Sequence, residues 1–193
     1  MGFFEGFKMG FEFFWTIVTA EPLLTGFLVL FALGAFLIAL IGNAIRYQKL
    51  KKSGILNVDQ MTGKEFEEYL RVLFLEKGYQ VQLTKTTGDY GADLVLSSKS
   101  RKIIVQAKRY KKNVGIKAVQ EISAAKKHYQ ADECWVVTNS HYTEPAKNLA
   151  KSNLVHLVDR TLLMKWMLEL KKKNEVRKGI SPTPKEERAV DRS

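Results

Sequence analysis

The sequence predicts an α/β domain, a mixed central sheet flanked by helices in the order αβββαβαβα, preceded by one transmembrane helix. After residue 59, segments with helical spacing of apolar residues alternate with short segments of strand character, which favours a sheet covered on both faces. Before that point, residues 22–45 form an apolar run of 24 residues. Residues 1–45 hold one basic and three acidic side chains, whereas the whole chain has a net charge of +11. The basic part therefore favours a polyanionic partner, either nucleic acid or an anionic membrane surface.

The first 21 residues are predicted to form an amphipathic helix in the membrane interface. Their phenylalanines recur at helical spacing with charged residues between them, and Trp15 suits an interfacial anchor. The recurring residues are Phe3, Phe7, Phe11 and Phe14. A hairpin of two membrane helices is the alternative, and it would reverse the side on which the N-terminus lies.

Residues 22–45 are predicted to cross the membrane. Thr25 and Asn43 carry their only hydrogen-bonding side chains, and a helix of this length spans about 36 Å against a hydrocarbon core of about 30 Å. Four cations follow at once and mark the cytoplasmic side: Arg46, Lys49, Lys51 and Lys52. A cleaved signal peptide fits poorly, because the start is acidic and the apolar run is late and long. The small pair Ala35 and Ala39 is a feature of helices that self-associate.

The rest of the chain divides into three parts. Residues 46–58 are predicted to be a basic juxtamembrane linker with a flexible break at Ser53-Gly54, and residues 59–170 form the domain. Residues 171–193 are charged and lack apolar periodicity, so we expect a disordered tail. The only cysteine, Cys134, lies in a segment of strand character and excludes an internal disulfide and a thiolate zinc cluster.

Local patterns predict the elements of the domain in order. Thr62 and Glu65 form a capping box that begins the first helix, and Gly78 ends it. Two strands at 92–96 and 102–109 flank a short polar loop, as in a hairpin. The other elements are a strand at 79–84, a helix at 114–129, a strand at 134–138, a helix that opens near 143–145, a strand at 154–158 and a final helix capped by Asp159.

The hairpin is predicted to bring three polar side chains together. A turn centred near Lys99 places Asp93 opposite Gln106, and Lys108 shares that face because it is two residues further along the strand. A carboxylate and a carboxamide oxygen can hold Mg²⁺, while an ammonium beside them can orient an attacking water and stabilise developing charge. The alternative is that Gln106 and Lys108 are solvated edge residues and that Asp93 only shapes a turn.

Five stretches of the chain, taken in order, resemble the Mrr-type branch of the PD-(D/E)XK nucleases, the domain of type IV restriction endonucleases. They are Gly63-Lys64-Glu65-Phe66-Glu67, Gly78-Tyr79-Gln80-Val81, Gly88-Asp89-Tyr90-Gly91-Ala92-Asp93-Leu94, Val105-Gln106-Ala107-Lys108-Arg109-Tyr110, and Val136-Val137-Thr138-Asn139-Ser140 followed by Tyr142-Thr143. The resemblance covers residues 61–167 and none of the membrane segment.

The resemblance implies an active site and a cofactor. Asp93 and Gln106 would be metal ligands, with Gln106 standing where the family motif has Asp or Glu, and Lys108 would be the catalytic lysine. Glu67 matches a glutamate of the first helix that approaches the metal, and Glu68 is the alternative for that role. The implied cofactor is Mg²⁺ or Mn²⁺.

Other residues near this hairpin are weaker members of the same prediction. The cations expected to contact phosphates are Lys85, Arg109, Lys111 and Lys112. Asp89 and Gln120 are further candidates for the site, although helical periodicity puts Gln120 opposite the apolar face of its helix.

The sequence thus predicts a membrane-anchored, metal-dependent DNA endonuclease with a cytoplasmic domain. Its partners would be DNA, bound mostly through phosphates, the lipid bilayer, and a second copy of the chain. A junction-resolving or DNA-repair nuclease is one alternative. A non-catalytic, membrane-tethered DNA-binding module is another, and a structural protein whose basic face meets anionic lipid is the third.

Overall fold

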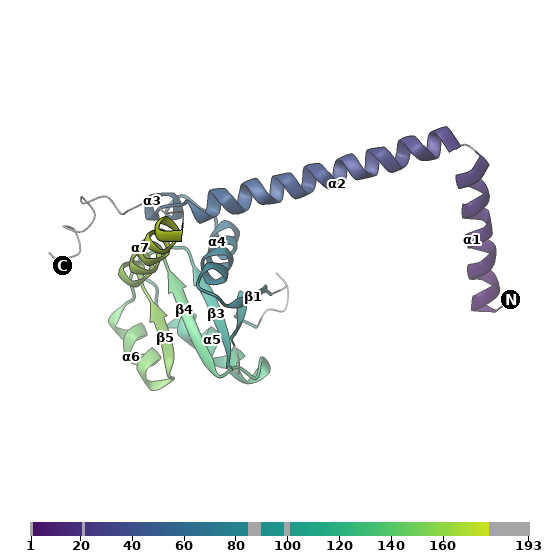
Figure 1. The fold of residues 1–193 in the computed structure, drawn as a ribbon. Coiled ribbons are helices and arrows are strands. Elements are labelled where there is room, and N and C mark those ends of the chain that lie inside the picture. The colour runs from purple at the N-terminus through teal and green to yellow at the C-terminus, as the bar shows by residue number, and fades with distance from the viewer. Residues whose placement is uncertain (1, 21, 85–89, 99–100, 178–193) are drawn as a thin grey trace. The chain divides into compact units, whose positions relative to one another are not determined.

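The computed structural model describes residues 2–20, 22–84, 90–98 and 101–177, which fall into two units, Met1–Gln48 and Lys49–Ser193 (Figure 1). Two helices make up the N-terminal part, α1 at Phe3–Ala20 and α2 at Pro22–Lys51. The remaining elements belong to the second unit, which carries the polar constellation expected from the sequence.

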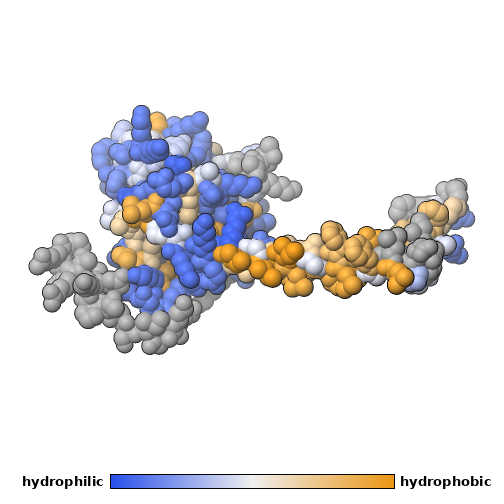
Figure 2. All heavy atoms as spheres, turned by 90° about the horizontal axis from the view of Figure 1, so that it is seen from above, coloured by the Kyte–Doolittle hydropathy of each residue, from blue (hydrophilic) through white to orange (hydrophobic). Residues whose placement is uncertain are grey.

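One helix in the described part of the chain is long and apolar enough to cross a membrane, judged by length and composition. It covers Thr25–Lys51, and none of its apolar stretch is buried. Figure 2 shows hydrophobic side chains along most of α2. The apolar run was expected to end as a helix at residue 45, but α2 continues to Lys51, because its basic C-terminal residues also favour helix.

A single five-stranded sheet forms the centre of the second unit, in the order β1-β2-β3-β4-β5. Its strands are β1 at Gln80–Leu83, β2 at Leu94–Ser98, β3 at Arg101–Lys108, β4 at Glu133–Thr138 and β5 at Val155–Val158. The pairs β1–β2 and β2–β3 are antiparallel, whereas β3–β4 and β4–β5 are parallel. The predicted mixed sheet is therefore confirmed, and β3 is its central strand.

Four helices cover the sheet: α4 at Gly63–Glu76, α5 at Ile116–His128, α6 at Glu144–Ser152 and α7 at Arg160–Arg177. With the strands they confirm the order αβββαβαβα from residue 63 onward. A first core, which includes Phe74 and Val105, lies between the sheet and α4 and α7. A second core, which includes Ile104 and Ile122, lies on the face covered by α5 and α6. Successive residues of β3 therefore face different cores.

Local capping signals predicted from the sequence are confirmed. Thr62 Oγ1 accepts the amide proton of Glu65 at 3.3 Å, and Glu65 Oε2 accepts the amide proton of Thr62 at 2.8 Å. Gly78 follows α4 with a φ of +95°, a conformation that glycine adopts at little cost. Asp159 Oδ1 accepts the amide proton of Leu162 at 2.9 Å and caps α7.

The last residues of α2 and the segment between α2 and α4 pack against the domain. Leu50 and Ile55 contact the first core, and Val58 is fully buried in it. Lys51 forms an ion pair with Glu76 of α4, with Nζ and Oε2 2.8 Å apart. A short helix not expected from the sequence, α3, spans Ile55–Val58. Where we expected a flexible linker, the described residues are anchored to the domain by apolar and charged contacts.

The final helix also differs from expectation. α7 continues to Arg177, although residues from 171 onward were expected to be a disordered tail. Lys171 and Glu175 lie one helical turn apart with Nζ and Oε1 at 3.9 Å, and such pairs sustain an exposed helix without an apolar face. The rest of the expected tail, residues 178–193, lies outside the described residues.

Candidate active site

Asp93 is fixed against the backbone of β3. The predicted register of β2 on β3 is confirmed. Just before β2 begins, the amide of Asp93 donates to Val105 O at 2.8 Å, and Asp93 Oδ2 accepts the amide proton of Ala107 at 2.7 Å. The carboxylate therefore lies beside the strand segment that carries Gln106.

Gln106 lies on a covered face of the sheet. It stands two residues after Ile104 on β3 and so shares the face of the second core, to which Ile104 belongs. Only 3% of Gln106 is exposed. Gln106 is therefore not the solvated edge residue of the alternative interpretation, because α5 packs against β3 and β4 on this side. Lys108 at the end of β3 is half-buried, with 22% of its side chain exposed. The three predicted residues thus lie at the edge of a core, and two of them contact the same partner on α5.

That partner is Glu121, which joins Gln106 to Lys108. Glu121 Oε2 accepts a hydrogen bond from Gln106 Nε2 at 2.8 Å and lies 3.2 Å from Lys108 Nζ. Its other oxygen, Oε1, lies 3.8 Å from Nζ of the exposed Lys117. One carboxylate therefore holds both the amide end of the glutamine and the ammonium of the lysine.

The loop before β2 approaches the same residue closely. Gly91 has a φ of +91°, and a Cβ at this position would lie 3.0 Å from the carbonyl oxygen of Glu121 and 3.1 Å from its Cβ. A larger residue would be strained by its backbone angle and crowded by the helix. Gly91 thus lets the segment leading to Asp93 pack directly against the turn of α5 that carries Glu121.

The electrostatics of the site favour an ionised Glu121. Partial burial raises the pKa of its carboxyl, but the hydrogen bonds from Gln106 and Lys108 and the charges of Lys108 and Lys117 outweigh this, so that the pKa lies below the usual glutamate value. The ionised form is the acceptor that both neighbours require. The arrangement is therefore charge-assisted and fixes the orientation of the Gln106 amide.

The orientation of Gln106 leaves a buried oxygen. Gln106 Oε1 has no hydrogen-bond partner among the described residues, and an unpaired buried carbonyl oxygen costs about 1–3 kcal/mol. In the described ranges, no group of three or more His, Cys, Asp or Glu side chains gathers to hold a metal ion. A metal site here would therefore include the carboxamide oxygen. The oxygen donors Asp93, Gln106 and Glu121 fit a hard divalent cation such as Mg²⁺ or Mn²⁺.

The other predicted site residues lie on α4, on α5 or outside the described residues. Glu67 is half-buried on α4, the helix of the first core, and Glu68 forms an ion pair with Arg71 at 2.9 Å. Gln120 is exposed on α5, as periodicity indicated. Lys85 and Asp89 lie outside the described residues. The role of Glu67 at the site stays a prediction.

The remaining cations follow β3. Lys111 and Lys112 are exposed, as a phosphate contact requires. Arg109 is half-buried, and its charge helps to lower the pKa of Asp59, after the larger effects of Arg160, burial and Asn139. Arg109 Nε is buried without a hydrogen-bond partner among the described residues.

Glu121 was missed by sequence reasoning, although a signal for it exists. Ala118 and Ala125 mark the buried face of α5, and Glu121 stands three residues after the first and four before the second. An acidic residue inside an apolar helical stripe needs a buried partner. The interpretation of α5 considered Gln120 instead, because its residue type matched the expected family pattern.

A family model for restriction endonucleases, Mrr_cat, matches residues 58–167, more than half of the chain. The chain belongs to this restriction endonuclease family. The matched range is therefore a restriction-endonuclease domain of the Mrr_cat family. The matched range includes Asp93, Gln106, Lys108 and Glu121, and it begins one residue before Asp59.

Solved structures are similar to parts of this chain. The DNA modification-dependent restriction endonuclease AspBHI is 19% identical at a TM-score of 0.49, with 66% of this chain and 36% of that chain covered. AF1548, a protein of unknown function, is 18% identical at a TM-score of 0.47, with coverage of 54% and 64%. The restriction endonuclease MspJI, in complex with a 27-mer oligonucleotide, is 18% identical at a TM-score of 0.43, with coverage of 55% and 28%. The chain thus spans less than two thirds of each of them, and no curated protein sequence matches it.

Proposed function

We propose that this protein is a membrane-anchored, metal-dependent DNA endonuclease whose active site consists of Asp93, Gln106, Lys108 and Glu121. The family supports endonuclease activity, and the proposal adds the membrane anchor, the metal and the residue roles. Asp93 directly precedes β2, Gln106 and Lys108 lie on β3, and Glu121 comes from α5, which packs against β3.

One observation carries the assignment of the site. Glu121 holds the amide nitrogen of Gln106 at 2.8 Å and the ammonium of Lys108 at 3.2 Å, and the carboxamide oxygen is left buried without a partner. A structural hydrogen-bond network satisfies its buried polar atoms. A buried oxygen left unpaired is instead suited to a ligand, and a divalent cation is the ligand that this oxygen would bind together with the carboxylates of the proposed site.

The residues supply complementary chemistry. A divalent metal ion, when bound, lowers the pKa of a water molecule and offsets negative charge on the scissile phosphate. Lys108 presents an ammonium that can orient the attacking water and stabilise negative charge on the phosphate oxygens. Glu121 keeps that ammonium in place and turns the Gln106 carbonyl oxygen away from α5. Asp93, held on the backbone of β3, supplies an anionic oxygen.

The membrane anchor rests on α2. Its Thr25–Lys51 stretch is long and apolar enough to span a bilayer, and the cations that follow the apolar run favour the cytoplasmic side for the nuclease domain. A reporter fused after Ser193 should be active only in its cytoplasmic form. Activity of a periplasmic reporter would contradict both the topology and the access to cellular DNA.

A nicking assay tests the active site. The full chain in mild detergent is incubated with supercoiled plasmid and Mg²⁺, Mn²⁺ or EDTA. We expect cleavage with either metal ion, none with EDTA, and none for Lys108→Ala. Lys117→Ala is the matched control, because it removes an exposed lysine near the same carboxylate, and it should cleave like the wild type. Cleavage in EDTA would contradict metal dependence, and cleavage by Lys108→Ala at the wild-type rate would contradict the site.

A further inference from the structure

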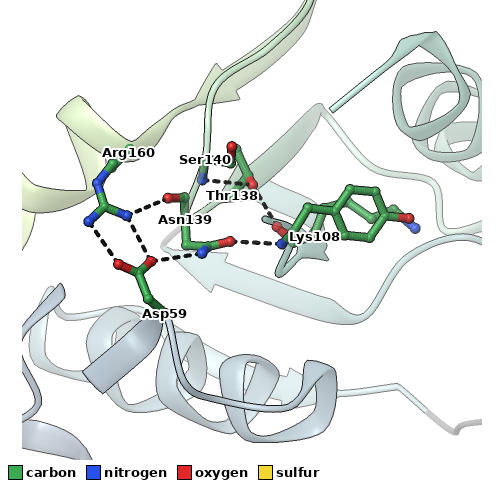
Figure 3. A network of polar contacts seen from close by, with 7 residues as sticks. Asp59, Lys108, Thr138, Asn139, Ser140 and Arg160 are labelled. Carbon is green, nitrogen blue, oxygen red and sulfur yellow. Dashed lines mark hydrogen bonds and ion pairs between the residues drawn. The ribbon is translucent and has the colours of Figure 1, made fainter. Parts of the chain in front are cut away.

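A second polar network lies where the juxtamembrane segment meets the ends of the strands (Figure 3). Asp59, directly after α3, forms a two-pronged ion pair with Arg160 at the start of α7. Arg160 Nη1 lies 2.7 Å from Asp59 Oδ1, and Nη2 lies 2.8 Å from Oδ2. About a quarter of each side chain is exposed, so the pair is well shielded from solvent. The planar fork of arginine matches a carboxylate in this geometry.

Asn139 connects this ion pair to the strand that carries Lys108. Asn139 is 4% exposed at the end of β4, and its Nδ2 donates to Asp59 Oδ1 at 2.9 Å. Its Oδ1 accepts the amide proton of Tyr110 at 2.8 Å, and its backbone oxygen accepts from Arg160 Nη1 at 2.9 Å. The side-chain amide of Asn139 therefore depends on Asp59 at one end and fixes the backbone after β3 at the other.

Thr138, the neighbour of Asn139, holds the same stretch from the other side. It is fully buried, and its Oγ1 donates to the carbonyl oxygen of Lys108 at 2.6 Å. The same Oγ1 accepts the amide proton of Ser140 at 3.1 Å. Side chains of Thr138 and Asn139 thus bind the backbone at Lys108 and at Tyr110, directly at and after the lysine of the proposed site.

We propose that Asp59 is a positioning residue of the nuclease site, which acts through Asn139 on the backbone that follows Lys108. The inference rests on the proposed role of Lys108. Asp59 fixes which end of the Asn139 amide faces the Tyr110 amide proton, because a carboxylate accepts only from the nitrogen end. Without it, the Asn139 side chain can rotate, and the segment from Lys108 to Tyr110 loses a fixed acceptor.

This role differs from simple stabilisation in a measurable way. An ion pair that only stabilises the fold changes the fraction of folded molecules and leaves the rate per folded molecule unchanged. A positioning residue changes the rate of the chemical step, because small displacements of a catalytic group reduce the rate strongly. The Michaelis constant for DNA should change little, because Asp59 is acidic and offers no attraction to phosphate.

The experiment measures kcat and KM for plasmid nicking by the full chain in mild detergent, at a temperature where circular dichroism shows each variant folded. Asp59→Asn is the main variant, because it keeps the size of the side chain, removes its charge and replaces one of the two oxygens that accept from Arg160 and Asn139 with an NH2 group. Glu144→Gln is the matched control, since it breaks an exposed ion pair with Lys147. Arg160→Lys is the milder variant, which keeps a cation but loses the two-pronged geometry. Lys108→Ala reports on the proposed site itself.

We expect Asp59→Asn to lower kcat tenfold or more with KM within twofold, Arg160→Lys to lower kcat about threefold, and Glu144→Gln to match the wild type. If Asp59→Asn does not fold, Arg160→Lys alone decides, and an unchanged kcat overturns the inference. A kcat per folded molecule equal to the wild type, or a change in KM alone, also overturns it. Wild-type cleavage by Lys108→Ala would instead overturn the proposed active site and this inference with it.

Discussion

Gln106 Nε2 donates to Glu121 Oε2 at 2.8 Å, from the central strand of the sheet to the helix that covers it. The bond determines that the nitrogen end of the carboxamide faces α5, and hence that the oxygen end is available to a ligand. A carboxylate at position 106 could not make this bond. Gln106 and Glu121 therefore form a matched pair, in which Glu121 supplies the negative charge and Gln106 supplies a neutral oxygen.

The pair predicts the effect of Gln106→Glu. Two carboxylates would then meet at hydrogen-bond distance, which raises the pKa of one of them and destabilises the metal-free protein by about 1–3 kcal/mol. Divalent cations should offset this repulsion, so Mn²⁺ should bind more tightly and raise the melting temperature more than in the wild type. Calorimetric titration and thermal melts measure both effects.

A matched variant controls for charge alone. Gln120→Glu adds the same charge on the exposed face of α5, and Mn²⁺ binding should be unchanged. If Gln106→Glu binds Mn²⁺ no more tightly while Asp93→Asn weakens binding, Gln106 is not a metal ligand. Its bond to Glu121 would then serve only to position the carboxylate that holds Lys108.

Glu121→Gln tests the residue that sequence reasoning missed. The substitution keeps the size of the side chain but removes the charge that holds Lys108 Nζ at 3.2 Å. We expect nicking to fall at least a hundredfold, which corresponds to about 2.7 kcal/mol in the barrier. The folded structure should persist, because Glu121 lies at the edge of the core, with 32% of its side chain exposed. Nicking within threefold of the wild type would show that Glu121 is dispensable.

Much of the fold could be predicted because its signals are local. The capping box at Thr62, the hairpin register that pairs Asp93 with the strand segment of Gln106, and the helix cap at Asp159 each depend on a few neighbouring residues. Patterns of this kind survive in the folded protein because tertiary contacts act in the same direction as local preferences.

The rest depended on contacts between distant segments. The Glu121 carboxylate meets Gln106 and Lys108 only once α5 has packed on β3, and no strand pattern indicates which helix residue will lie there. The packing of Leu50 and Val58 in the first core was missed for a similar reason. Their segment is short, follows a basic run and shows no helical period of its own, so it was interpreted as a linker.

The Asp59–Arg160 pair predicts a pH dependence of stability. The hydrogen bonds from Arg160 lower the pKa of Asp59 from its ordinary value of 3.8, against the opposing effect of burial and with further lowering by Asn139. A lowered folded-state pKa gives stabilisation that is complete above 3.8 and is lost as the pH falls through the lower folded-state value. Asp59→Asn should therefore be less stable than the wild type at pH 7, by about 1–3 kcal/mol.

Urea denaturation at several pH values measures this difference. It should stay constant from pH 7 to about pH 5 and shrink only in the acid range below the ordinary aspartate pKa. Glu144→Gln, which breaks an exposed pair, should differ little from the wild type throughout. Equal stability of Asp59→Asn and the wild type at pH 7 would contradict a stabilising ion pair.

The packing of residues 50–58 against the first core predicts where the domain begins. We expect fragments 49–193 and 53–193 both to fold, because the capping box and both cores lie after residue 53. Leu50, which packs against the first core, is the exception. Fragment 49–193 should be more stable. It retains the Leu50 contact with the first core and the Lys51–Glu76 ion pair at 2.8 Å, in which both side chains are largely shielded. Together these contribute about 1–3 kcal/mol.

Urea midpoints of the two fragments measure the difference, and Lys51→Met in fragment 49–193 separates its two sources. This variant keeps an apolar stem over the domain but removes the charge that pairs with Glu76. Its urea midpoint should therefore lie between those of fragments 49–193 and 53–193. Equal midpoints for fragments 49–193 and 53–193 would show that residues 49–52 contribute nothing to the domain. A lysine that stays free in water gains almost nothing from a neighbouring carboxylate. The basic run would then act only on the membrane, which is the role that the sequence alone had indicated.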